Sequence, residues 1–106
     1  MIVYLAGPYR ASTREGVQSN IDRAAAKAQQ LWSLGHYVIC PHLNSPHFTG
    51  PDSLFLDGYI EIMKRCDAVY VLAGSENSHG TQAEIATAIS IGLPVYVEGI
   101  NELEDT

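Results

Sequence analysis

The sequence holds 106 residues, of which 46% are hydrophobic and 17% are charged. This length and composition fit one globular domain spanning residues 1–106. Twelve acidic against six basic side chains give a formal net charge of −6, which argues against a nucleic acid polymer as a partner. No apolar run approaches the roughly 20 residues of a membrane helix, and no signal-like segment opens the chain. We therefore expect a cytoplasmic protein without a membrane partner.

The N-terminal third of the chain predicts a strand followed by a long amphipathic helix. Residues 2–6 (IVYLA) are apolar, β-branched or aromatic, and Gly7-Pro8 marks the turn that ends this strand. Ser12 and Glu15 have the Ser-x-x-Glu spacing of a capping box, which predicts a helix start. Apolar residues then recur at helical spacing as far as Gly35, where we expect the helix to end.

The middle of the chain predicts a second strand, a loop and a second helix. Residues 37–40 (YVIC) fit a short strand, and residues 41–51, which include three prolines, fit a loop. Residues 54–65 place their apolar side chains on one stripe and two basic side chains in the last turn, as a helix does. Cys40 and Cys66 have no CxxC spacing, and we expect both to be buried, reduced thiols.

The C-terminal part predicts two more strands around a buried helix. Residues 68–72 (AVYVL) and 94–97 (PVYV) fit strands, and residues 80–91 fit a helix that is apolar on most sides. This alternation predicts a three-layer, Rossmann-like α/β sandwich, with a four- to five-stranded parallel sheet covered on both faces. We expect the acidic residues 100–106 to be frayed or to form an interaction surface.

Three polar segments follow strands of this predicted sheet. They are residues 7–10, the loop that begins at Pro41, and residues 73–81. Ligands of open parallel sheets bind outside the carboxyl ends of the strands, so we expect these segments to line a site. The third segment leads into a helix start, whose free amides and dipole favour an anion. The sequence therefore predicts a small-molecule site with room for a phosphate.

Glu84 lies three residues after Thr81, and this spacing has two interpretations. The carboxylate can bond back to the amide of a helix cap at Thr81, as in a capping box. Alternatively, it can face the cleft, attack a sugar carbon or stabilise an oxocarbenium-like transition state. The spacing alone leaves both interpretations open.

Other candidate groups have simple structural interpretations when taken alone. Tyr4, on the first strand, fits core packing with its hydroxyl at the rim, and Asp57 fits a solvated helix face. Cys40, His42 and His47 match no strong metal signature, and we expect no metal or other cofactor. The absence of GxGxxG, Walker and nucleophile-elbow motifs argues against dinucleotide reductases, P-loop enzymes and serine hydrolases.

Four stretches of the chain are similar to one known family. They are YLAGPYR (4–10), CDAVYVL (66–72), GSENSHGTQAEIATA (74–88) and GLPVYVE (92–98). In this order they resemble the nucleoside 2-deoxyribosyltransferase superfamily over nearly the whole chain, most of all its small phage and bacterial members. The resemblance implies a flavodoxin-like domain, a homodimer or higher homo-oligomer, and a nucleoside or nucleotide as the small-molecule substrate.

The resemblance also implies catalytic roles for three residues. Glu84 stands where the superfamily has the glutamate that attacks the anomeric carbon and releases the base. The related deoxynucleoside 5′-monophosphate N-hydrolases have a catalytic tyrosine in the first strand, which Tyr4 matches. Asp57 corresponds to an aspartate that assists departure of the base.

Five further residues match substrate-binding positions. Gly7, Tyr9 and Arg10 belong to the loop after the first strand, where these enzymes have a phosphate-binding arginine. Ser78 matches a phosphate-binding serine six residues before the glutamate. The resemblance implies that Ser78, Arg10 and the amides around Gly80 hold a 5′-phosphate.

Two departures from the family pattern bear on the reaction. Ser75 replaces a tryptophan that is common in the subgroup, and the chain has no C-terminal extension of the kind that supplies an asparagine to a neighbouring subunit. We therefore expect hydrolysis of the N-glycosidic bond more than transfer. Two other functions stay open: a catalytically silent nucleotide-binding or sensing module, and a phosphoribohydrolase of the cytokinin-activating type, whose GGxGTxxE motif resembles SHGTQAE (78–84).

Overall fold

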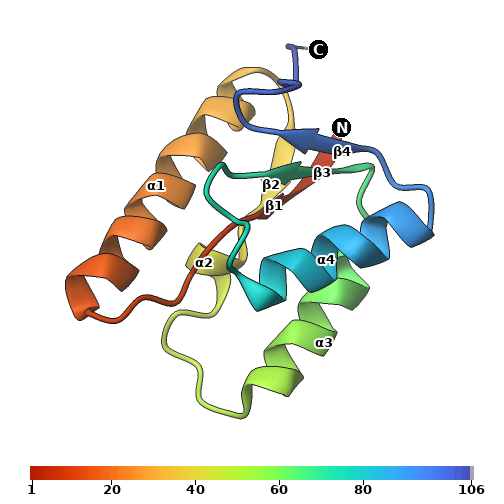
Figure 1. Cartoon of the computed structure of the whole chain (residues 1–106). Helices are drawn as coiled ribbons and strands as arrows, with labels where there is room; N and C mark the ends of the chain where they lie inside the picture. Colours follow the sequence, from red (N-terminus) through yellow and green to blue (C-terminus); the bar gives the residue numbers. More distant parts are fainter. Residues whose placement is uncertain (106) are drawn as a thin grey trace.

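Strands and helices alternate along residues 1–105, the part of the chain that the computed structural model describes (Figure 1). The elements are β1 (Ile2–Ala6), α1 (Arg14–Ser33), β2 (Tyr37–Ile39), α2 (Pro41–Asn44), α3 (Asp52–Met63), β3 (Ala68–Val71), α4 (His79–Ser90) and β4 (Val95–Val97). The four strands are parallel and lie in the order β2-β1-β3-β4. The predicted α/β fold with a parallel sheet is confirmed, with four strands.

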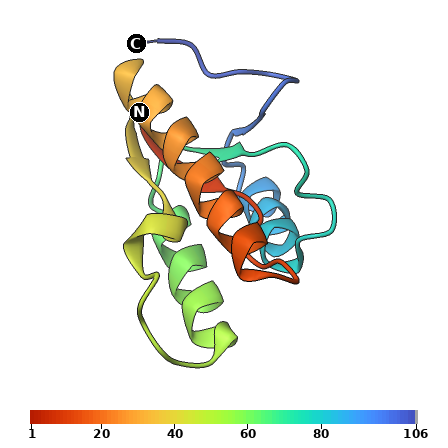
Figure 2. The same cartoon turned by 90° about the vertical axis from the view of Figure 1, so that its left-hand side faces the viewer.

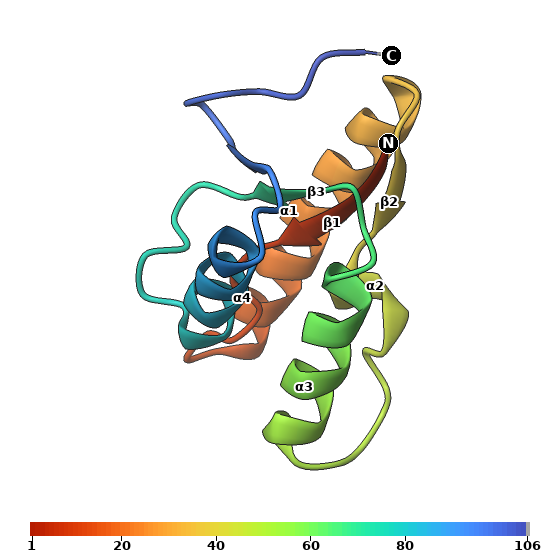
Figure 3. The ribbon, with the colours of Figure 1, turned by 90° about the vertical axis from the view of Figure 1, so that its right-hand side faces the viewer.

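Helices cover the sheet on both faces, which gives the three predicted layers. Helix α1 lies on one face (Figure 2), and α3 and α4 lie together on the other (Figure 3). Side chains alternate along a strand, so Val3 and Leu5 of β1 pack with the apolar face of α1, whereas Tyr4 and Ala6 pack toward α3 and α4. None of the helices in residues 1–105 is long and apolar enough to cross a membrane.

The connections reverse direction at β1, in the middle of the sheet. From β1 the chain crosses to β2 on one side, then returns past β1 to β3 on the other side. Ala6 pairs with Val71, so β1 and β3 end side by side. A Cβ atom at Gly7 would lie 2.6 Å from the Leu72 side chain, so any larger residue would require Leu72 to shift. This is the switch point at which ligands of such sheets bind.

Two local predictions differ from the structure. Thr13, not Ser12, caps α1, and its hydroxyl accepts a hydrogen bond from the amide of Gly16 at 3.0 Å. Glu15 then falls one position too early to complete a capping box. The expected loop 41–51 begins with the short helix α2, because Pro41 suits the first position of a helix. Both cysteines are free and buried, as expected.

The acidic tail packs against the body of the protein as far as residue 105. Leu103 is 7% exposed and joins the core on the α1 side of the sheet. The Tyr70 hydroxyl donates to the Glu102 carboxylate, and the buried His36 ring lies 2.6 Å from the Glu104 carbonyl oxygen. The prediction of a frayed tail is wrong for these residues, because one leucine among the acidic residues anchors the segment. Thr106 lies outside the described residues.

Replacement of this anchor should destabilise the whole domain. Leu103→Ala removes buried apolar contacts, and we expect the free energy of unfolding to fall by about 2–4 kcal/mol in urea titrations. Ile100→Ala is the matched control, because Ile100 is 81% exposed and its loss should change stability by less than about 0.5 kcal/mol. Equal stability of the two variants would contradict the packed tail.

Candidate active site at the carboxyl ends of β1 and β3

The first turn of α4 determines where Glu84 lies. Ser78 is the N-cap, and its hydroxyl accepts from the amide of Thr81 at 3.4 Å and lies 2.8 Å from the Thr81 hydroxyl. Glu84 is therefore six residues beyond the cap, whereas a capping box requires the third. The interpretation of Thr81 and Glu84 as a capping box is wrong.

Glu84 instead pairs with Tyr4 across the interface between α4 and the sheet. Tyr4 is fully buried, Glu84 is 8% exposed, and the tyrosine hydroxyl donates to Oε2 of the carboxylate. No buried side-chain nitrogen or oxygen in residues 1–105 lacks a hydrogen-bond partner. Oε1, which has no protein partner, therefore keeps contact with solvent. One oxygen of the carboxylate is held in place and the other is available for chemistry.

Burial changes the ionisation of both partners. Burial raises the pKa of Glu84 from its usual 4.5 to about 7, and the hydrogen bond from Tyr4 offsets only part of this rise. Burial also raises the pKa of Tyr4 far above its usual value, and the negative charge of Glu84 adds to the effect. Tyr4 is therefore a constant hydrogen-bond donor, while Glu84 changes its charge close to neutral pH.

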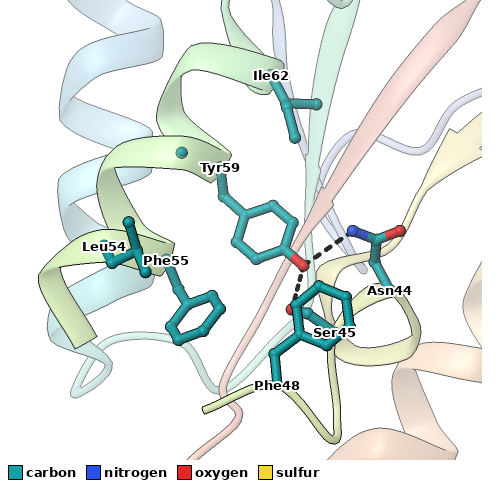
Figure 4. A pocket seen from close by; sticks show the side chains of 8 residues that line it. Asn44, Ser45, Phe48, Leu54, Phe55, Tyr59 and Ile62 are labelled. Carbon is teal, nitrogen blue, oxygen red and sulfur yellow. Dashed lines mark hydrogen bonds between the residues drawn. The ribbon is translucent and has the colours of Figure 1, made fainter. Parts of the chain in front are cut away.

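A small aromatic pocket lies between α3 and the segment that begins with α2 (Figure 4). Tyr59 belongs to the pocket lining and also packs against the core cluster that contains Tyr4. Its hydroxyl bonds with the Ser45 hydroxyl and accepts from the Asn44 amide at 3.1 Å. The pocket has a volume of about 190 Å³ and is completed by Phe48, Leu54, Phe55, Gly58 and Ile62.

The sequence analysis missed the polar residues of this pocket. Asn44 and Ser45 follow a strand at the carboxyl edge of the sheet, which was the available signal. Tyr59 gave none, because its spacing on α3 is also that of an ordinary core residue. Nearby, the buried His42 ring lies 2.8 Å from the Pro8 carbonyl oxygen and 5.8 Å from the Tyr9 ring, which fixes the loop after β1. Burial lowers the pKa of His42 and favours the neutral ring.

The predicted phosphate residues are spread along the edge of the site. Ser78 and Gly80 lie at the start of α4, where the first backbone amides have no carbonyl partner within the helix and the Thr81 amide donates to Ser78. A Cβ atom at Gly80 would approach Leu56 no closer than 3.9 Å, so packing does not require glycine there. Arg10 is exposed and forms an ion pair with Asp52. Its role in phosphate binding stays a prediction.

Asp57 is not brought together with Glu84. It is exposed on α3, two residues before Tyr59, and a two-residue step turns a helix by about 200°. Because Tyr59 points toward the pocket and the Tyr4 side, Asp57 points away from both. Its role in assisting the leaving base stays a prediction.

Two residues distant in the sequence hold the loop that carries the start of α4. The Arg23 guanidinium donates to the Ala73 carbonyl at 2.5 Å and to Glu98 at 2.8 Å, and Glu98 accepts from the Ala73 amide at 3.0 Å. Ser75, at the position of the subgroup tryptophan, is buried, and its hydroxyl donates to the Leu72 carbonyl at 2.6 Å. Within residues 1–105, no group of three or more His, Cys, Asp or Glu side chains is placed to hold a metal ion.

The architecture and the site geometry define a Rossmann-like α/β domain with a buried tyrosine–carboxylate pair between α4 and the central strand β1. Residues 1–97 match the family model described as a domain of unknown function, DUF4406, and the chain belongs to this family. No curated protein matches the chain. The fold implied by the resemblance to the nucleoside 2-deoxyribosyltransferase superfamily is confirmed by a solved structure.

That structure is the 2-deoxyribosyltransferase from the psychrotolerant bacterium Bacillus psychrosaccharolyticus. The two structures are similar with a TM-score of 0.69, and the match covers 92% of this chain and 71% of that chain. The sequences are 21% identical over the match. At this identity the likeness establishes the fold, and the chemistry has to be argued from the site.

The raised pKa of Glu84 predicts a specific dependence of stability on pH. Between about pH 4.5 and pH 7 the folded protein holds a proton that the unfolded chain has released, so stability falls as pH rises through this window. A shift from 4.5 to about 7, at about 1.4 kcal/mol per pKa unit, corresponds to about 3 kcal/mol. Glu84→Gln has no carboxyl group to titrate at this position, so its free energy of unfolding should not fall in this window. Relative to wild type, the variant should therefore become more stable as pH rises.

Urea titrations of both proteins at pH 4.5, 6 and 8 measure this difference. Glu76→Gln is the control, because Glu76 is exposed in the adjoining loop and should follow wild type at every pH. A constant difference in stability between Glu84→Gln and wild type across the window would contradict the assignment.

Proposed function

We propose that the chain cleaves the N-glycosidic bond of a nucleoside, deoxynucleoside or 5′-monophosphate, with Glu84 as the nucleophile. The observation that carries the proposal is the buried pairing of Glu84 with Tyr4 at the switch point of the sheet. The fold is shared with a 2-deoxyribosyltransferase, an enzyme described as a biocatalyst for the synthesis of nucleosides. Fold and site together favour this reaction over the binding-only and phosphoribohydrolase alternatives.

The proposed reaction begins with attack by Glu84 on the anomeric carbon of the sugar. The bond from the carbon to the base nitrogen breaks, its electron pair leaves with the base, and an ester joins the sugar to Glu84. Water then attacks the same carbon and regenerates the carboxylate, which completes hydrolysis. A second base in place of water would complete transfer. Tyr4 holds Oε2 throughout, so that Oε1 faces the sugar.

The electrostatics of the pair suit this role. A carboxylate with a pKa of about 7 is more basic than an exposed one, and therefore a better nucleophile once it is ionised. Because attack requires the ionised form, kcat/KM should rise as pH passes through about 7. Tyr4 stays protonated across this range and stabilises the ionised carboxylate.

Loss of the Glu84 carboxylate should abolish turnover but preserve the fold. We expect Glu84→Gln to lower kcat by several orders of magnitude, because the amide can accept from Tyr4 but is a poor nucleophile. Free base released from a panel of nucleosides and 5′-monophosphates is measured by chromatography, with Glu76→Gln as the matched control. Full turnover by Glu84→Gln would sink the proposal, and wild type that binds but never releases base would identify a silent binding module. Release of ribose 5-phosphate from AMP, with no base released from any nucleoside or deoxynucleotide, would favour a phosphoribohydrolase of the cytokinin-activating type.

A 5′-phosphate fits the start of α4. Ser78 offers a hydroxyl, and the amides of the first turn, including that of Gly80, lie at the positive end of the helix dipole. Arg10 reaches a phosphate there only after it exchanges its ion pair with Asp52, so its contribution is partly offset. Because the net charge is −6, a preference for nucleotides has to come from these local groups.

The phosphate site predicts a selective effect on nucleotides. Wild type should bind a 5′-monophosphate more tightly than its nucleoside, and Ser78→Ala and Arg10→Ala should each weaken only the monophosphate. Charge-assisted bonds of about 1.5–3 kcal/mol set an upper limit of roughly 10- to 100-fold per substitution. Arg14→Ala, at the exposed start of α1, is the control. Equal affinity of wild type for the two ligands by calorimetric titration would refute the phosphate assignment.

A homo-oligomer is part of the proposal. Two apolar side chains that line the pocket are exposed, Phe48 at 67% and Leu54 at 58%, and Leu43 of the adjoining α2 is 50% exposed. A second copy of the chain that covered them would bury apolar surface and close the cleft.

A further inference from the structure

We infer that Tyr59 is the residue that contacts the leaving base, by donating its hydroxyl proton in a hydrogen bond to an acceptor on the edge of a nucleobase in the aromatic pocket. This inference rests on the proposed function and names the group that acts opposite Glu84. It assigns to Tyr59 the role that the family resemblance gave to Asp57.

The position of Tyr59 is the first argument. Its ring packs against the core cluster that contains Tyr4, the hydrogen-bond partner of Glu84. At the same time it lines the pocket (Figure 4). Tyr59 therefore borders both the pocket and the core cluster that holds the partner of Glu84.

The hydrogen bonds around Tyr59 are the second argument. The Asn44 amide donates to the phenol oxygen at 3.1 Å. The Ser45 hydroxyl bonds to the same oxygen, and either group can be the donor. When Ser45 donates, the phenol oxygen accepts two hydrogen bonds and its own proton is free for a ligand. Two donors on this oxygen also polarise the O–H group, which strengthens the bond that it donates.

The composition of the pocket is the third argument, because it indicates the class of ligand. The Phe48 and Phe55 rings and two aliphatic side chains offer apolar contact, and the polar atoms gather at the Tyr59 end (Figure 4). A flat ring with apolar faces and a hydrogen-bond acceptor on one edge satisfies both parts. A nucleobase has this chemistry, whereas an aromatic hydrocarbon would leave the polar end unused.

The contact also has a chemical purpose in the proposed reaction. When the bond between the anomeric carbon and the base nitrogen breaks, the electron pair moves onto the base. A hydrogen bond from Tyr59 stabilises the charge that develops, and the released base takes its proton from water. The interaction is stronger in the transition state than in the bound substrate, so it accelerates cleavage.

A binding experiment tests the contact without any requirement for turnover. Adenine, hypoxanthine, cytosine, thymine and indole are titrated into wild type, Tyr59→Phe and Ser45→Ala, with Tyr37→Phe as a control on the exposed face of β2. We expect at least one nucleobase to bind wild type more tightly than indole does. Tyr59→Phe should weaken that base roughly tenfold and leave indole unchanged. Unchanged binding of the base, or no binding of any base to wild type, would overturn the inference.

A kinetic experiment then tests the effect on the leaving group. Tyr59→Phe should slow cleavage of a nucleoside at least tenfold more than cleavage of 4-nitrophenyl 2-deoxyriboside, whose leaving group needs no hydrogen bond. Equal slowing of the two substrates, or a selective loss in Asp57→Asn with none in Tyr59→Phe, would overturn the inference. Wild type that binds a base through Tyr59 but cleaves neither substrate would refute the proposed function alone.

Discussion

The hydrogen bond from Tyr4 to Glu84 joins the central strand to α4 in the interior of the domain. Burial of an ionised carboxylate costs solvation free energy. The raised pKa of Glu84 indicates that the hydrogen bond from Tyr4 offsets only part of this cost. An apolar residue of similar size would pack at this place without the penalty. A chain that keeps the carboxylate here gives up stability at neutral pH, which is typical of a group needed for chemistry.

Other parts of the molecule serve to place this pair. Gly7 lets the chain leave β1 in close contact with Leu72, directly after the strand that carries Tyr4. On the other side, Arg23 from α1 and Glu98 from the end of β4 bind both polar groups of Ala73. These contacts fix the course of the loop from β3 to α4, and with it the position at which α4 begins. From that position, the second turn of α4 places Glu84 against Tyr4, and the third turn places Ala88 in the core.

Short-range patterns in the sequence were sufficient for the fold and insufficient for the site. The strands were predicted correctly because a short apolar run, such as residues 68–72, indicates a buried strand without any information from distant residues. The pairing of Tyr4 with Glu84 joins residues 80 positions apart, and capping spacing alone gave an equally good interpretation of Glu84. Asp57 and Tyr59 differ by two positions on one helix, and only the packed structure shows which of them faces the cleft. The tail was mispredicted because its acidic composition outweighed Leu103.

The charge distribution around Glu84 explains why tyrosines suit this site. A second carboxylate near Glu84 would raise its pKa further and reduce the ionised fraction at neutral pH. Among residues 1–105, the side chains bonded to Glu84 and Tyr59 are Tyr4, Ser45 and Asn44, which are all uncharged. Glycosidases commonly add a carboxylic acid to protonate an alkoxide-like leaving group. A nucleobase spreads its charge over a ring, so hydrogen bonds from neutral groups can stabilise its departure, and a single carboxylate suffices for the reaction proposed here.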